Sequence, residues 1–180
     1  MQAMRGISVY AQKRGYYIMY TFSNNEEEEL EFIKQYVRGK LVDGIILLTS
    51  RQDDRCISYL KKTGHPYVLI GRPEDPSDTL WVYNDNFQAM YNVEDYLIKR
   101  GHKEIAFIGG PDNLYVTRDR LEGYKKALKT HAIPEDEGKI KFTGEFCREC
   151  GYEAMIDILK YATPRAVVTT DDLLAFGANR

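Results

Sequence analysis

The 180-residue chain has few cysteines, no marked excess of one charge and no long apolar run. Its longest uninterrupted aliphatic stretch is Ile45 to Leu48, whereas a helix needs about 20 apolar residues to cross a bilayer. The sequence therefore predicts no membrane helix, and the first twenty residues show no signal-peptide pattern. Lys and Arg number 25 against 27 Asp and Glu, so the formal charge is -2. Binding of DNA through charge alone is excluded.

The cysteine set is odd in number and sparse, which favours a reducing, cytoplasmic location over a disulfide-rich secreted fold. Cys147 and Cys150 form a C-x-x-C motif, which at a helix N-terminus can make a redox pair. The motif lacks the aromatic-Cys-Gly-Pro-Cys context of redox enzymes, and it supplies only two of the four ligands of a structural zinc. A redox role for the two thiols stays open.

Motifs for catalysis and cofactor binding are also missing. The sequence has no G-x-G-x-x-G, no Walker-type glycine loop, no H-E-x-x-H pair and no G-x-S-x-G elbow. His65, His102 and His131 stand alone in turns or at helix ends. We therefore predict no metal site, no cofactor and no enzymatic activity, with a hydrolase as the third-ranked possibility.

Short apolar runs alternate with segments of helical periodicity, which predicts an α/β fold with parallel sheets flanked by helices. The acidic run that follows Asn25 predicts a helix start and not a metal site, because negative charge is favoured in the first turn of a helix. The predicted strands are residues 16–22, 44–48, 67–70, 81–83, 104–108, 140–142 and 166–169. The predicted helices include residues 26–40, 86–100, 119–129, 152–159 and 171–179.

Polar residues lie just past the ends of three of these strands. Arg72 comes after the strand that ends at Ile70, Asp85 comes after 81–83, and Asp171 comes after 166–169. Ligands of open parallel sheets bind at the carboxyl ends of the strands, and a mixture of guanidinium, carboxylate and aromatic groups suits a sugar. Helix capping is the competing explanation for Asp85 and for Asp172.

The order of these residues and of several short motifs along the chain resembles the effector-binding core of the LacI/GalR family of bacterial transcription regulators. The resemblance covers nearly the whole chain in register. The matching pieces are Arg5-Gly6-Ile7, Arg14-Gly15-Tyr16, Val42-Asp43-Gly44-Ile45-Ile46, Pro66-Tyr67-Val68-Leu69-Ile70-Gly71-Arg72, Asp85-Asn86, Gly101-His102-Lys103, Phe107-Ile108-Gly109-Gly110, Arg120 with Gly123-Tyr124, Gly151-Tyr152-Glu153-Ala154, and Asp172 with Ala175 and Gly177.

The resemblance implies a two-lobed fold like that of periplasmic binding proteins, with the effector between the lobes. Residues 1–109 would form the N-terminal lobe without its first strand, and 110–180 an incomplete C-terminal lobe. Carried over by position, the family's effector contacts are Arg120, Phe146 and Asp171, with Asp85 as a weaker member. Arg72 is a further candidate because of its place after a strand. Position 171 is usually Asn in the family, so the carboxylate here could change which ligand hydroxyl is bound.

The family also implies partners. A small sugar would be the effector. The motifs around Gly71-Arg72-Pro73 and Leu121 to Leu128 look most like those of maltose-operon repressors of Gram-positive bacteria. This narrower resemblance suggests maltose or another α-glucoside. Operator DNA would be bound by an N-terminal helix-turn-helix that is not in this chain, and the regulator would be a cytoplasmic homodimer without membrane contact. The alternative function is that of an exported sugar-binding protein of a transporter.

Overall fold

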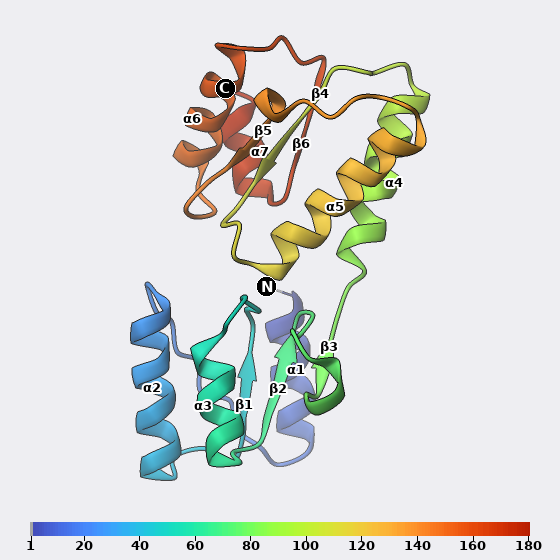
Figure 1. Ribbon diagram of the computed structural model, residues 1–180. Helices are drawn as coiled ribbons and strands as arrows, with labels where there is room; N and C mark the ends of the chain where they lie inside the picture. The colour runs from blue at the N-terminus through green and yellow to red at the C-terminus, as the bar shows by residue number, and fades with distance from the viewer. Residues whose placement is uncertain (1) are drawn as a thin grey trace. The chain divides into compact units, whose positions relative to one another are not determined.

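The computed structural model describes residues 2–180, in which helices and strands alternate along the chain (Figure 1). The chain divides into two compact units. The first unit comprises the N-terminal segment up to Asp43 together with Arg55–His65, and the second comprises Gly44–Asp54 and Pro66–Arg180. The second unit holds both β-sheets.

The first unit contains the three helices α1 (Gln2–Lys13), α2 (Glu26–Gly39) and α3 (Arg55–Thr63). Asn25 caps α2, because its side chain accepts a hydrogen bond from the Glu28 N–H at 2.9 Å. The acidic run therefore lies in the first turn of a helix, as the sequence predicts. Helix α3 is not among the predicted elements, since its nine residues are too few for a clear periodic pattern.

The prediction of a strand over residues 16–22 is wrong. This segment belongs to neither sheet, and aromatic side chains that a strand would bury are exposed there, among them Tyr17 at 99% and Phe22 at 81%. A strand is stabilised by hydrogen bonds to a neighbouring strand, and the described residues give this segment no such neighbour.

Six short strands form two parallel sheets of three in the second unit. The first sheet has the order β1-β2-β3, with β1 at Ile45–Leu47, β2 at Tyr67–Ile70 and β3 at Trp81–Val82. The second has the order β5-β4-β6, with β4 at Ile105–Gly109, β5 at Ile140–Phe142 and β6 at Ala166–Thr169. Two short 3-10 helices, η1 (Pro76–Asp78) and η2 (Glu137–Lys139), lie in the connections. The α/β prediction with parallel sheets is confirmed.

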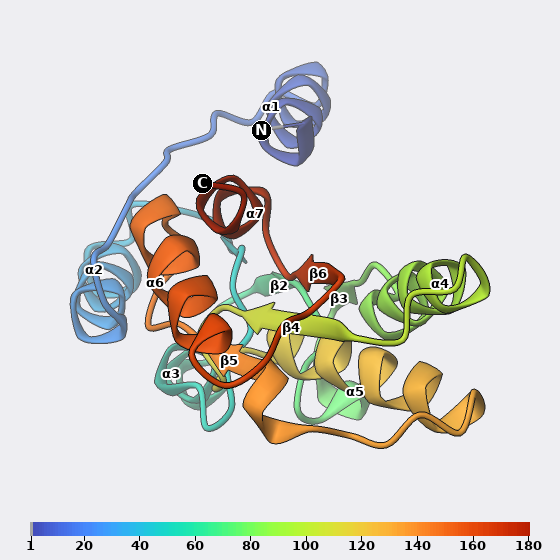
Figure 2. The same cartoon turned by 90° about the horizontal axis from the view of Figure 1, so that it is seen from above.

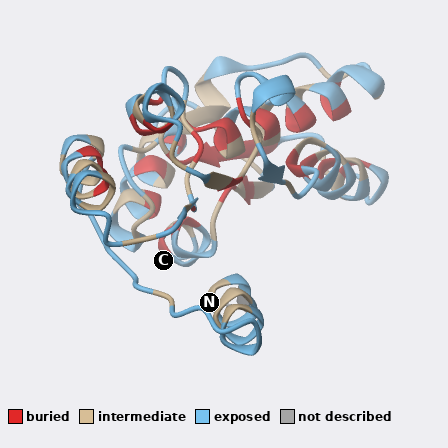
Figure 3. Ribbon diagram, turned by 90° about the horizontal axis from the view of Figure 1, so that it is seen from below, coloured by how far each residue is buried: buried red, intermediate tan, exposed pale blue. Residues whose placement is uncertain are grey.

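Helices cover both faces of the second sheet (Figure 2). Strand β4 is buried at every residue, and its side chains alternate between the faces as the pleat requires. Ile105 and Phe107 join a core with α4 (Asn86–Lys99) and α5 (Tyr115–Thr130), whereas Ala106 and Ile108 join a core with α6 (Arg148–Leu159) and α7 (Asp172–Ala178). The buried residues of these elements gather around this sheet (Figure 3).

Two glycines allow α6 and α7 to approach closely. A Cβ at Gly151 would collide with the Leu174 carbonyl oxygen, and a Cβ at Gly177 would collide with that of Arg148. The first turn of α6 is therefore packed directly on the backbone of α7.

The predicted lobe boundary after Gly109 falls at the end of β4. Both strands that pair with β4 follow that boundary in the chain, and helix α4, which precedes β4, packs on α5. Strand β4 and helix α4 are thus tied by hydrogen bonds and packing to elements that follow Gly109, and the division at 109 and 110 stays a prediction.

Among residues 2–180, none of the helices has the length and apolar character needed to cross a membrane.

Candidate functional site

The candidate ligand residues lie just beyond the carboxyl ends of strands in the second unit. Arg72 follows β2, Asp85 follows β3 and Asp171 follows β6, while Phe146 lies in the loop after β5. Arg120 is in the second turn of α5, which begins shortly after β4. This placement agrees with the crevice in which open parallel sheets bind ligands.

Arg72 is held in a fork by Asp119. Its Nη2 donates to Asp119 Oδ1 at 2.7 Å, and its Nε lies 3.1 Å and 3.2 Å from the two carboxylate oxygens. The hydrogen bonds that Arg72 donates to Asp119 raise the pKa of the Arg72 guanidinium. The guanidinium carbon also lies 4.6 Å from the centre of the Tyr115 ring, a cation–π contact. Arg72 is therefore a rigid group whose donors are already partly engaged.

Tyr83 completes this cluster. Its hydroxyl donates to Asp119 Oδ2 at 2.8 Å and accepts from the Asn86 N–H at 3.2 Å. Burial and the hydrogen bond to Asp119 raise the pKa of the Tyr83 hydroxyl, so it stays protonated at neutral pH. The negative charge of Asp119, which is only 8% exposed, is thus paired with the Arg72 guanidinium and also accepts a hydrogen bond from the Tyr83 hydroxyl.

Arg120 is oriented by residues from two other elements. Its Nε and Nη2 both donate to Asn86 Oδ1, at 3.0 Å and 2.9 Å, and its Nη1 donates to the Thr170 carbonyl oxygen. Burial lowers the pKa of the guanidinium, while the negative charge of Asp171 opposes that shift. Arginine remains charged even so. The guanidinium is a desolvated cation in a defined orientation.

Asp171 is the N-cap of α7. Its Oδ1 accepts from the Leu173 N–H at 2.7 Å, and among the described residues its Oδ2 has no hydrogen-bond partner. The side chain is half-buried. The carboxylate thus combines a structural role with an oxygen that can accept a hydrogen bond from a ligand.

Phe146 supplies an apolar face. Its ring lies directly over Gly110, where a Cβ would overlap the ring atoms, and it packs against the core that contains Ala106 and Ile108. Thr143 anchors this loop to the sheet, since its N–H donates to the Gly109 carbonyl oxygen at 2.9 Å. A side chain at position 110 would therefore displace the Phe146 ring from its present position.

Asp85 is an exposed helix cap. Its carboxylate accepts from the Gln88 N–H at 2.8 Å at the start of α4, and its side chain is exposed. The capping explanation raised from the sequence accounts for this residue. A ligand contact by Asp85 stays a prediction.

Four polar residues of this region were not predicted as site residues: Tyr83, Asn86, Asp119 and Thr170. Asn86 and Asp119 are each 8% exposed, and they accept the hydrogen bonds of Arg120 and Arg72, respectively. In the sequence, the only sign of their role is that Asn86 directly follows Asp85 and Asp119 directly precedes Arg120. A sequence does not show which side chains meet across a fold.

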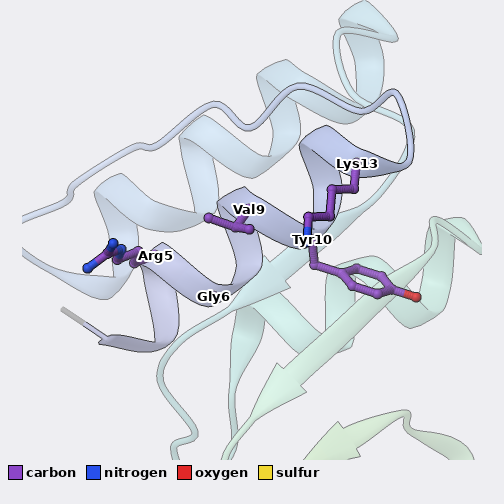
Figure 4. Close-up of a pocket in the computed structure, with 5 residues that line it drawn as sticks. All are labelled: Arg5, Gly6, Val9, Tyr10 and Lys13. Carbon is purple, nitrogen blue, oxygen red and sulfur yellow. The ribbon is translucent and has the colours of Figure 1, made fainter.

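A separate hollow of about 460 Å³ lies along α1. Its lining residues all belong to that one helix: Arg5, Gly6, Val9, Tyr10 and Lys13 (Figure 4). None of the predicted ligand residues lines it.

Comparison with known proteins establishes the family. The profile described as "Periplasmic binding proteins and sugar binding domain of LacI family" matches residues 1–180. The chain belongs to this family. The resemblance inferred from the sequence is therefore confirmed.

The relatives of this LacI-family chain are transcription regulators. It is 40% identical over 176 residues to the HTH-type transcriptional regulator MalR of Streptococcus pneumoniae, covering 97% of this chain and 53% of MalR. It is 32% identical over 179 residues to CelR of Thermobifida fusca, covering 97% of this chain and 52% of CelR. The chain thus spans about half the length of these curated relatives. They are regulators and not enzymes, in agreement with the sequence.

Solved structures show the same fold. A LacI-type transcriptional regulator from Bacillus cereus subsp. cytotoxis has a TM-score of 0.93 at 42% identity, covering 98% of this chain and 63% of that one. A CelR–cellobiose complex has a TM-score of 0.90 at 31% identity, covering 97% and 54%. The two-lobed, periplasmic-binding-protein-like class predicted from the sequence is thereby supported, and an exported transport protein is not favoured.

Proposed function

We propose that this LacI-family chain is the sugar-sensing core of a transcriptional repressor, and that Arg120, Asp171 and Phe146 contact the sugar. The observation that carries the proposal is the half-buried Arg120 guanidinium, held by Asn86 and by the Thr170 carbonyl oxygen and accompanied by the charge of Asp171. A desolvated, oriented cation beside strand ends is a costly arrangement that a polar ligand would justify.

The chemistry of the three side chains suits a carbohydrate. A guanidinium only donates hydrogen bonds and a carboxylate only accepts them, so Arg120 and Asp171 together can satisfy hydroxyl groups that do both. The Phe146 ring, half-buried over Gly110, offers an apolar face of the kind that covers the C–H face of a sugar ring. Arg72 supports the site through Asp119 and Tyr83, and its fork leaves fewer donors for the ligand itself.

A disaccharide of glucose is the sugar that the relatives favour. CelR has been solved as a complex with cellobiose, and MalR shares more identity with this chain than CelR does. We propose maltose or another α-glucoside as the effector.

For the whole protein we propose a cytoplasmic homodimer that binds operator DNA through an N-terminal helix-turn-helix. The support is the description of MalR and CelR as HTH-type regulators, together with the fact that this chain covers about half of each. The formal charge of -2 agrees with DNA contacts that lie outside this segment.

The test is a titration of the full-length protein with maltose, cellobiose and glucose by calorimetry and thermal shift. A sugar that binds only the folded state raises the melting temperature, and the stabilisation grows with the logarithm of its concentration relative to its Kd. We expect maltose to bind and to release operator DNA, with cellobiose weaker. The proposal fails if no sugar in the panel shifts the melting temperature or produces heat.

A further inference from the structure

Two cysteines at the start of α6 have a geometry that the proposed function does not use. Cys147 and Cys150 form a disulfide, and their Cα atoms lie 5.1 Å apart, within the range of about 4.4 to 6.8 Å typical of such bonds. Both residues are half-buried, so small reagents can reach them. The third cysteine, Cys56, is fully buried on α3.

The two sulfurs differ in their surroundings. Cys147 is the N-cap of the 12-residue helix α6, and its Sγ accepts from the Cys150 N–H at 2.9 Å. An amide donor and the positive end of a helix dipole both stabilise negative charge on sulfur. Cys150 lies within the first turn and packs against the core that contains Ala106 and Ile108. Cys147 is therefore the nucleophile of the pair and Cys150 the resolving thiol.

The pair lies between two parts of the candidate sugar site. Phe146 directly precedes Cys147, and Gly151, which directly follows Cys150, packs on the backbone of α7 at Leu174. Helix α7 begins with the capping residue Asp171. The state of the two sulfurs thus acts on the one turn that joins the Phe146 loop to α7.

We propose that Cys147 and Cys150 form a reversible dithiol–disulfide site that controls how rigidly Phe146 is held. Oxidation is a two-electron exchange with a small-molecule disulfide such as glutathione disulfide. The Cys147 thiolate attacks one sulfur of that disulfide and releases the first thiol. Cys150 then attacks the Cys147 sulfur and releases the second, so one protein dithiol and one disulfide become one protein disulfide and two small thiols.

The ring closed by the disulfide includes the first turn of α6. In the oxidised form this ring restricts the backbone next to Phe146, while in the reduced form only the Cys147 cap and the packing of Cys150 remain. Pre-organisation of a binding residue lowers the entropic cost of binding. The oxidised protein should therefore hold the sugar more tightly, a consequence that rests on the proposed function, whereas the thiol chemistry does not.

The first experiment equilibrates the intact protein in glutathione buffers of graded ratio and counts alkylated thiols by mass spectrometry. We expect one reversible transition that involves only Cys147 and Cys150. Cys150→Ser should trap a mixed disulfide with glutathione at Cys147, Cys147→Ser should form far less of it, and Cys56→Ala should leave the midpoint unchanged. Two thiols that never pair under oxidising conditions would overturn the proposal, as would a disulfide that excess dithiothreitol cannot reduce in the folded protein.

A metal site is the competing outcome. A Glu145 carboxylate oxygen and the two sulfurs lie within 4.8 Å of one another. If the purified protein retains stoichiometric zinc that blocks alkylation of both thiols, and removal of zinc by a chelator does not lead to a disulfide, the redox proposal is refuted.

The second experiment compares amide hydrogen exchange of residues 143–151 and 172–177 in the two states. We expect faster exchange of these amides in the reduced protein. We also expect the reduced protein to bind maltose about fivefold or more weakly than the oxidised protein, which is the low end of the coupling commonly found between two sites. Equal exchange in both states would overturn the control of Phe146. If neither state binds any sugar while exchange differs, the proposed function fails and the redox site stands.

Discussion

Glu94 on α4 is a buried acid, and we predict that it makes the stability of the protein fall as pH rises. Its side chain is 0% exposed, and neither carboxylate oxygen has a hydrogen-bond partner among the described residues. It lies on the same helix face as Met90 and Ile98, one turn away from each, within the core that includes Tyr124. The Tyr124 hydroxyl donates to the Ile105 carbonyl oxygen at 3.0 Å and so does not serve Glu94.

Burial raises the pKa of Glu94 from 4.5 to about 8. The folded state therefore holds a proton that the unfolded state releases over this pH range. The stability is fully present below the unfolded pKa and is lost as pH rises toward the folded pKa, with a slope of about 1.4 kcal/mol per pH unit. At pH 7, roughly 3 kcal/mol of the free energy of unfolding should have been lost relative to pH 4.5.

The perturbation is Glu94→Met, which keeps a side chain of similar length and removes the charge. We expect the variant to be more stable than the parent by roughly 3 kcal/mol at neutral pH, with a much smaller difference near pH 5. Urea denaturation followed by circular dichroism at several values between about pH 5 and pH 8 measures the free energy of unfolding. The control is Glu122→Gln, since Glu122 is exposed on α5 and should leave the slope unchanged.

Parallel pH profiles for the parent and Glu94→Met would refute this reasoning, because they would show that Glu94 does not change its proton occupancy on folding. A variant less stable than the parent at pH 7 would refute it as well.

Three further predictions concern the site and the scaffold. Arg120→Ala and Asp171→Ala should each weaken sugar binding roughly tenfold or more, since a desolvated ligand hydroxyl loses its partner. Calorimetry measures the affinity, and the control variant Asp171→Asn keeps the α7 cap. Unchanged affinity in a folded alanine variant would contradict the site. Gly177→Ala should cost roughly 1 to 3 kcal/mol of stability, because the new Cβ meets the Arg148 carbonyl oxygen; an unchanged urea midpoint would argue against that packing. Asn25→Ala should cost about 1 kcal/mol by loss of the α2 cap, and Asn25→Asp should restore it in the same denaturation assay.

Much of the fold follows from local pattern. The strands predicted at 67–70 and 166–169 agree with β2 and β6, because continuous apolar runs are typical of strands in a parallel sheet covered on both faces. The strand predicted at 140–142 agrees with β5, although Lys141 interrupts its apolar run. The helix starts at Asn25 and Asp85 were visible because capping depends on one side chain and the next three residues. The segment 16–22 has an equally apolar pattern but lacks a partner strand among the described residues, which its own sequence does not reveal.

By itself, the sequence determined the α/β class and the family, since these depend on periodicity and on motifs in register. The resemblance to that family implied Arg120, Phe146 and Asp171 as candidate ligand residues. Tertiary structure alone decided that Arg72 is engaged by Asp119, that Asn86 orients Arg120, and that Glu94 is buried with no hydrogen-bond partner in residues 2–180. It also decided that β4 pairs with later strands. The physical reason is that hydrogen bonds and burial between residues distant in the chain depend on how the elements pack, and spacing along the chain does not specify that packing.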